Sequence, residues 1–161
     1  MSPLNKRRWQ NFKQNKRAIY SLLIFSIFFL ISVFAEFIAN DKPLMIYYNK
    51  EFYSPIIKNY SERVFGGEFE TEAEYKTIEV ECLILSGGML DECLDNPKKT
   101  ISKTQELNLN NWILWPPIKS SFDTVNYDVD VAPSPPDNNH LLGTDDQTRD
   151  VVARIIYGFR L

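Results

Sequence analysis

The stretch AIYSLLIFSIFFLISVFA, residues 18–35, decides the fold of this chain. It holds eighteen consecutive uncharged residues, of which twelve are Leu, Ile, Val or Phe, and it contains neither Gly nor Pro. Twelve such residues favour insertion into a membrane by on the order of 5 kcal/mol. A helix that continues to Ile38 is about 31 Å long, which matches a hydrocarbon core of roughly 30 Å. The sequence therefore predicts one transmembrane helix over residues 18–38.

The charges around this stretch predict its orientation. Residues 1–17 carry no acidic residue and six basic ones: Lys6, Arg7, Arg8, Lys13, Lys16 and Arg17. Because basic flanks stay in the cytoplasm, we expect residues 1–17 there and everything after residue 38 on the other side of the membrane, outside the cytoplasm. Removing these six of the 18 basic residues leaves 12 against 21 acidic ones, a net charge of -9 over residues 18–161. Such an acidic chain is not expected to bind nucleic acid.

A cleaved signal peptide is the alternative interpretation of the apolar stretch. Val33 and Ala35 fit the small-residue pattern of a cleavage site. However, the apolar core is longer than the 7–15 residues usual in signal peptides, and this length favours a retained anchor.

Residues 39–139 are expected to form a small mixed α+β domain outside the membrane. Short apolar runs at residues 43–48, 52–57 and 112–118 are separated by turn residues and predict strands. Thr71 and Glu74 resemble a capping box for a helix over residues 72–85, which Gly87 and Gly88 would end. The same residues also alternate in polarity, so a strand remains open there. Residues 132–139, APSPPDNN, are typical of an extended connector.

The two cysteines, Cys82 and Cys93, lie eleven positions apart. In an oxidising compartment they would form a disulfide worth up to roughly 3 kcal/mol, and the alternative is a pair of unpaired thiols. They do not have the spacing of a metal site, and His140 is the single histidine. The chain also lacks the common nucleophile, zinc-protease, phosphate-loop and dinucleotide motifs. We therefore expect no enzyme, no catalytic residue, no metal and no cofactor.

The last 22 residues, HLLGTDDQTRDVVARIIYGFRL, predict an amphipathic helix over residues 140–161. Thr144 and Gln147 form a capping-box pattern, and acidic residues precede basic ones in the direction that the helix dipole favours. Val151, Val152, Ile155, Ile156 and Phe159 fall on one stripe. A helix of this kind lies on a membrane or packs against one.

The same segment resembles a signature of the dipeptide and oligopeptide ABC importer permeases. Two positions differ from that signature: Thr148 replaces its usual Gly, and Ala153 replaces its usual Ser. Further pieces, among them AEFIANDKPL (35–44), FGGEFETEAEY (65–75) and APSPP (132–136), resemble the branch associated with microcin C and oligopeptide uptake. The residues that carry the signature are His140, Leu142, Gly143, Thr144, Asp145, Arg149, Asp150, Arg154, Tyr157, Gly158 and Arg160.

This resemblance implies an inner-membrane permease subunit that imports peptides by alternating access. Its partners would be a second permease subunit, two cytoplasmic ATPase subunits and a periplasmic peptide-binding protein. Such permeases usually continue through five more transmembrane helices, so residues 1–161 resemble the N-terminal portion alone, from a truncated or split gene or a partial chain. We expect such a portion not to transport by itself. The rival hypothesis is a single-pass, membrane-anchored binding or scaffold protein.

Overall fold

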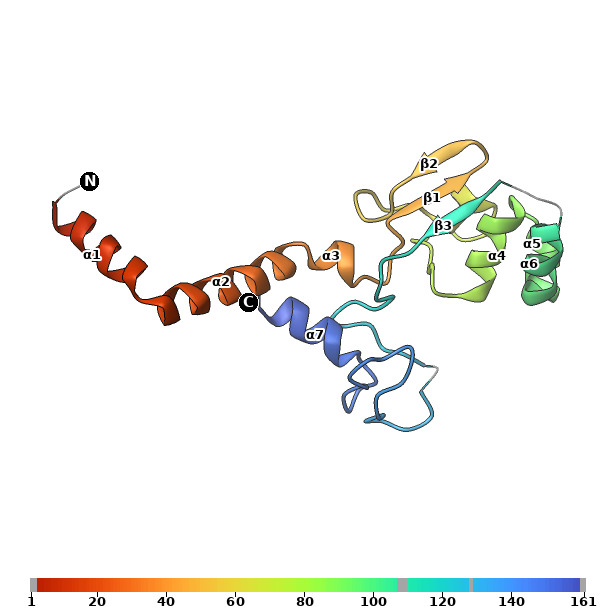
Figure 1. Cartoon of the computed structure of the whole chain (residues 1–161). Coiled ribbons are helices and arrows are strands. Elements are labelled where there is room, and N and C mark those ends of the chain that lie inside the picture. Colours follow the sequence, from red (N-terminus) through yellow and green to blue (C-terminus); the bar gives the residue numbers. More distant parts are fainter. Residues whose placement is uncertain (1–2, 107–109, 128, 160–161) are drawn as a thin grey trace.

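The computed structural model describes residues 3–106, 110–127 and 129–159, which form the elongated molecule of Figure 1. Two helices at one end, α1 (Pro3–Gln14) and α2 (Lys16–Val33), contain the basic segment and most of the apolar stretch. They meet at Asn15, whose side chain caps α2 by accepting the N–H of Ala18 at 3.3 Å. Among the described residues, α2 is the one helix long and apolar enough to cross a membrane.

The apolar helix is interrupted at Phe34, although the sequence predicts a continuous helix to residue 38. A short helix, α3 (Ala35–Ile38), follows this residue. The interruption turns Ala35 and Ala39 toward the C-terminal helix, where both are fully buried. The helix is therefore interrupted at the point where these two small residues pack against the C-terminal helix.

Three short strands form one antiparallel sheet beyond α3. They are β1 (Met45–Tyr48), β2 (Glu51–Tyr53) and β3 (Trp112–Leu114), in the order β2-β1-β3. Ile46 in the central strand lies opposite Tyr53 on one side and Ile113 on the other. Each strand comes from, or directly overlaps, one of the apolar runs that predicted strands.

One face of this sheet covers the main core. Ile46 and Tyr48 pack against Phe65 of the 3-10 helix η1 (Glu62–Phe65) and against Val80 and Ile84 of helix α4 (Ile78–Ser86). Phe65 is fully buried, and its ring meets that of Tyr48 edge-on with centroids 5.5 Å apart. Side chains alternate between the two faces of a strand, so Tyr47 lies on the opposite face with the rings of Phe52 and Trp112.

The helix predicted over residues 72–85 begins later than expected. Its N-cap is Thr77, and the proposed Thr71–Glu74 capping box does not form. The reason is that residues 71–73 pair with residues 60–62: Glu62 N–H donates to Thr71 O, and Ala73 N–H donates to Tyr60 O, both at 3.1 Å. Gly87 ends the helix, as predicted, in the left-handed conformation with φ +79°. The structure thus selects the helix over the strand for residues 78–86.

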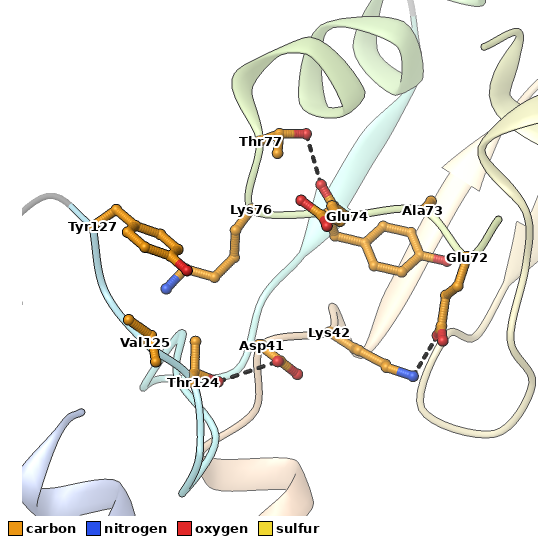
Figure 2. A pocket seen from close by; sticks show the side chains of 11 residues that line it. Asp41, Lys42, Glu72, Ala73, Glu74, Lys76, Thr77, Thr124, Val125 and Tyr127 are labelled. Carbon is orange, nitrogen blue, oxygen red and sulfur yellow. Dashed lines mark hydrogen bonds and ion pairs between the residues drawn. The ribbon is translucent and has the colours of Figure 1, made fainter. Parts of the chain in front are cut away.

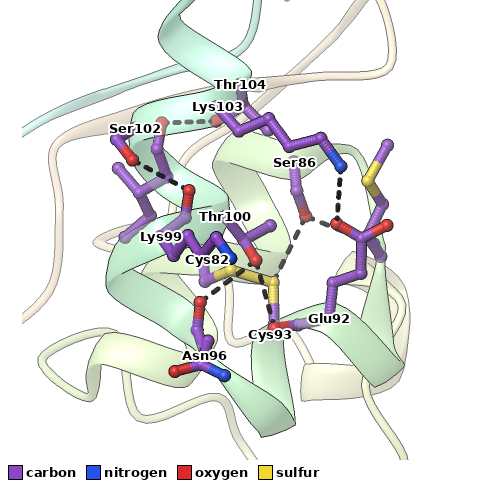
Figure 3. Close-up of polar contacts among 12 residues, drawn as sticks. Cys82, Ser86, Glu92, Cys93, Asn96, Lys99, Thr100, Ser102, Lys103 and Thr104 are labelled. Atoms are coloured by element: carbon purple, nitrogen blue, oxygen red, sulfur yellow. Dashed lines mark hydrogen bonds and ion pairs between the residues drawn. A yellow bond between two sulfur atoms is a disulfide. The ribbon is translucent and has the colours of Figure 1, made fainter.

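Two further helices, α5 (Leu90–Asp95) and α6 (Pro97–Glu106), complete the part of the interval 76–111 that the structure describes. A disulfide joins Cys82 of α4 to Cys93 of α5 (Figure 3). The Thr100 hydroxyl of α6 donates to Glu92 O and Asn96 O at 3.1 Å. The disulfide and these hydrogen bonds hold the three helices together as one unit.

The C-terminal segment contains a much shorter helix than predicted, α7 (Val151–Gly158). Residues 140–150 form turns, so the helix boundaries expected at 140–161 are wrong at their start, while Arg160 lies outside the described residues. The buried residues of α7 are Ala153 and Tyr157, whereas Ile155 is 49% exposed. The packed face is therefore displaced from the predicted stripe. Figure 1 shows that α7 runs beside α2.

Candidate functional site

Hydrogen bonds join the signature loop, which we define as residues 140–150, to the Pro-rich connector, residues 132–139. Thr144 forms three hydrogen bonds with Ser134: its N–H donates to Ser134 O at 3.2 Å, its Oγ1 accepts the Ser134 N–H at 3.1 Å, and the two hydroxyls bond at 3.0 Å. His140 is buried, and its ring Nδ1 lies 3.3 Å from Asp137 Oδ1. The backbone N–H of His140 is the main cause that lowers the pKa of Asp137. The loop and the connector thus form one folded unit.

Gly143 occupies a position in this unit that excludes a side chain. Its φ of +74° lies in the left-handed region, and a Cβ added there would be 2.2 Å from Ser134 O. Its own carbonyl accepts the N–H of Val151, the first residue of α7, at 3.2 Å. The glycine therefore brings connector, loop and helix start together at one point.

Asp145 is the centre of an ion cluster. Its carboxylate accepts the backbone N–H of Gln147 at 2.8 Å and that of Arg149 at 2.9 Å. The Arg149 guanidinium binds the same carboxylate through Nε at 2.9 Å, and the Arg154 guanidinium binds it as well. The Asp145 side chain is 13% exposed. One carboxylate therefore connects the turn to the exposed side of α7.

These contacts determine the charge state of Asp145. Burial alone would raise the pKa of its carboxyl, but the hydrogen bonds from Arg149 and Gln147 and the positive charge of Arg149 outweigh it. The pKa falls from 3.8 to about 2. Asp145 is consequently ionised throughout the physiological pH range.

Asp150 is the N-cap of α7. It is 1% exposed, and its Oδ1 accepts the N–H of Ala153 at 2.9 Å. A carboxylate at this position also interacts favourably with the helix dipole. Its role explains why the helix begins at residue 151 rather than near Thr144, whose hydroxyl is already bonded to Ser134.

Thr148, one of the two positions that differ from the signature described above, adopts a positive φ of +58°. Glycine is the residue that adopts this conformation without steric cost, so the backbone here favours glycine. Asn126 holds the turn: its side-chain amide donates to Thr148 O at 2.9 Å, and its own N–H donates to Thr148 Oγ1 at 3.2 Å.

Helix α7 docks against the apolar helix α2 and the residues after it. The hydroxyl of Tyr157 donates to Ala39 O at 2.9 Å. Ala153 is fully buried with Ala35 and Ala39, where its small side chain allows close approach. Further along, the ring of Phe159 stacks on that of Phe28 in α2, with centroids 5.2 Å apart. The signature segment therefore orients a helix along the apolar span.

The structure brings together six of the signature residues at the start of α7. These residues are Gly143, Thr144, Asp145, Arg149, Asp150 and Arg154. Leu142 is 55% exposed, while a Cβ on Gly158 would meet open space. The sequence analysis did not identify Ser134, Asn126 and Ala39 as contacts of this segment. These residues bind Thr144, Thr148 and Tyr157, which lie far from them in the sequence, and no local sequence pattern marks such long-range contacts. Among the described residues, no three metal-ligating side chains gather at one point.

Comparison with known proteins shows which permeases the chain resembles. Residues 2–55 match the family described as the N-terminal TM domain of oligopeptide transport permease C. The chain is 37% identical to the peptidoglycan transport system permease protein YejE of Agrobacterium fabrum and 38% identical to the inner membrane ABC transporter permease protein YejE of Escherichia coli. The two alignments cover 99% and 100% of the chain, respectively. These matches make the chain similar to the N-terminal portion of transporter permease proteins.

The chain spans about two fifths of the length of these relatives, 42% of the first and 41% of the second. No solved structure matches it. The names of both relatives describe permease proteins of transport systems, and the name of the E. coli relative describes an inner membrane ABC transporter.

Proposed function

We propose that this chain forms the first membrane helix, α2, and the outer domain, residues 39–159, of a permease that imports peptides. The observation that carries the proposal is the Asp145–Arg149–Arg154 cluster, which fixes the start of α7 beside α2. A subunit that moves between inward- and outward-open states needs a rigid connection between its outer domain and its membrane helices. The signature segment supplies such a connection.

In this proposal α2 crosses the inner membrane with residues 1–17 in the cytoplasm, and residues 39–159 lie in the periplasm. The six basic residues before α2 support the orientation. The Cys82–Cys93 disulfide supports it independently, because structural disulfides persist in oxidising compartments such as the periplasm. The interruption at Phe34 then falls close to the periplasmic surface of the inner membrane.

Peptides are the cargo that the family description names. The name of the Agrobacterium relative mentions peptidoglycan, whose stem peptides belong to the same chemical class. The proposed partners are a second permease subunit, two cytoplasmic ATPase subunits and a periplasmic peptide-binding protein. The outer domain would contribute to the entrance of the pathway.

A chimera tests this function through assembly. Residues 1–161 would replace the corresponding part of the E. coli relative in cells that lack the native permease. We expect the chimera to co-purify with the ATPase subunits and the second permease subunit of that transporter. A chimera that reaches the membrane but purifies alone would favour the rival hypothesis of a single-pass binding or scaffold protein.

A further inference from the structure

Helix α1 lies at the end of the molecule that is farthest from the sheet, and it leaves the start of α2 at an angle (Figure 1). The two helices do not continue into one another because Asn15 between them has an extended backbone, with φ −86° and ψ 94°. α1 has 12 residues and buries none of them. A helix of this length is marginal in water when nothing packs against it. α1 therefore needs a surface that the described part of the chain does not supply.

The charged side chains of α1 and of the first turn of α2 are all positive. The six basic residues of this segment are exposed, and no acidic residue occurs before Glu36. In the outer domain, by contrast, Lys42 binds the carboxylate of Glu72 (Figure 2). Among the described residues, none of the six basic side chains before α2 and in its first turn forms such an ion pair. Their charge is thus available to anions from outside the chain.

Apolar side chains gather on one side of α1. The helical repeat places Leu4, Trp9 and Phe12 on this side, and Lys6 lies on the other. The rings of Trp9 and Phe12 stack with centroids 5.8 Å apart, and Lys13 Nζ lies 5.4 Å from the centre of the Trp9 ring. Tryptophan, with an apolar ring and a polar N–H, is enriched where a membrane meets water. This combination of an apolar side and surrounding positive charges is typical of a helix that lies in a membrane interface.

We propose that α1 lies along the cytoplasmic surface of the membrane and binds the head groups of anionic phospholipids. The Trp9 ring lies at the boundary between head groups and acyl chains, and Arg7 and Arg8 bind lipid phosphates, which a guanidinium can hold through two hydrogen bonds. Because α1 directly precedes the membrane span, it lies at the depth of the head groups, where anionic lipids attract basic segments. The inference rests on the proposed function in one respect, namely that residues 1–17 are in the cytoplasm.

Hydrogen exchange of the full chain in two kinds of lipid nanodisc tests this proposal. One kind contains phosphatidylcholine alone, and the other contains phosphatidylglycerol in addition, which carries a negative charge. We expect residues 3–14 to exchange about tenfold more slowly in the anionic nanodiscs at low salt, while residues 78–86 of α4 exchange equally in both. The difference should disappear at about 1 M salt, where the Debye length is about 3 Å. Equal exchange of residues 3–14 in the two lipids, or a difference that persists at high salt, would overturn the proposal.

Paired substitutions assign the lipid binding to the charges of α1. Arg7→Gln with Arg8→Gln removes two charges and keeps residues that favour a helix, so we expect it to lose most of the difference between the two lipids. Arg7→Lys with Arg8→Lys keeps the charges and should retain the difference. Lys98→Gln with Lys99→Gln, an exposed pair on α6, is the matched control and should leave it unchanged. A difference that survives the first variant, or that the control variant also loses, would refute the assignment.

Failure of this proposal is distinguishable from failure of the proposed function. If residues 3–14 become protected in either lipid only after the ATPase subunits are added, α1 binds a protein partner, and the lipid proposal alone is overturned. A chain whose α1 is protected by anionic lipid, in a chimera that purifies alone, would remove the transporter assignment and keep the lipid-binding helix.

Discussion

Arg149 binds the carboxylate of Asp145 through two different groups, its backbone N–H and its Nε–H, each at 2.9 Å. This double contact closes the turn before α7 and orients the guanidinium at the same time. Arg154, one turn into α7, binds the same carboxylate. The most strongly constrained part of the signature is therefore a turn and the helix that follows it.

The first prediction concerns Asp145→Asn. The folded-state pKa of about 2 lies below the ordinary 3.8, so ionised Asp145 stabilises the fold above pH 4, and this contribution is lost as the pH falls toward 2. The shift corresponds to about 2 kcal/mol. We expect the variant to lower the protection of residues 143–154 in hydrogen exchange at pH 7 by about this amount. Protection in the variant that still falls between pH 4 and pH 2 as in the wild type would contradict the assignment.

The second prediction concerns Thr148→Gly. A β-branched residue at φ +58° carries a backbone cost of order 1–3 kcal/mol, and glycine removes it. The change also removes the bond that Thr148 Oγ1 accepts from Asn126, worth about 1 kcal/mol. We expect a small net gain in the unfolding midpoint in urea. Thr148→Ala loses the bond and keeps the strain, so it should lower the midpoint; the same response from both variants would count against a strained turn.

The start of α7 shows where prediction from the sequence succeeds and where it fails. The family signature drew attention to residues 140–160, but local patterns placed the helix start at Thr144 rather than Asp150. Thr144 has the right residue type for a cap, yet its hydroxyl is bonded to Ser134, ten positions earlier in the sequence. The residue that caps a helix is one whose polar group remains available after tertiary contacts form. The local sequence does not show which residue that is.

The same reasoning explains the fold of the outer domain. Short apolar runs bounded by turn residues predict β1, β2 and β3, because a half-buried strand has a recognisable local pattern of apolar residues. The capping box at Thr71 was wrong because residues 71–73 pair with residues 60–62, a contact of the extended backbone with no side-chain signature. The break at Phe34 was also missed, since uniform apolarity does not reveal where a helix turns.

The third prediction tests the disulfide. On the chain-entropy model, a crosslink that closes an eleven-residue loop contributes about 3 kcal/mol. We expect the paired change Cys82→Ser with Cys93→Ser to destabilise α4, α5 and α6 by up to this amount in hydrogen exchange, while α7 keeps its protection. Thiol labelling of the wild-type chain extracted from cells should find no free cysteine. Free thiols at both positions would contradict the periplasmic placement of the domain.

The fourth prediction concerns the contact between α7 and the end of the membrane span. Ala153 is fully buried against Ala35 and Ala39, so Ala153→Leu forces the helices apart at a cost of about 1–3 kcal/mol. Ile155→Leu, at a position that is 49% exposed on the same helix, is the matched control. We expect exchange protection of α7 to fall in the first variant alone. Equal effects would show that this face of α7 does not pack against the span.

The most direct test of the central claim is peptide uptake by the chimeric permease that carries residues 1–161. Uptake of a labelled tripeptide would be measured in cells that contain the remaining subunits, with Asp145→Asn and Glu79→Gln chimeras made in parallel. We expect uptake by the unmodified chimera and by Glu79→Gln, and a clear reduction for Asp145→Asn. A chimera that assembles with its partners and imports no peptide would contradict it.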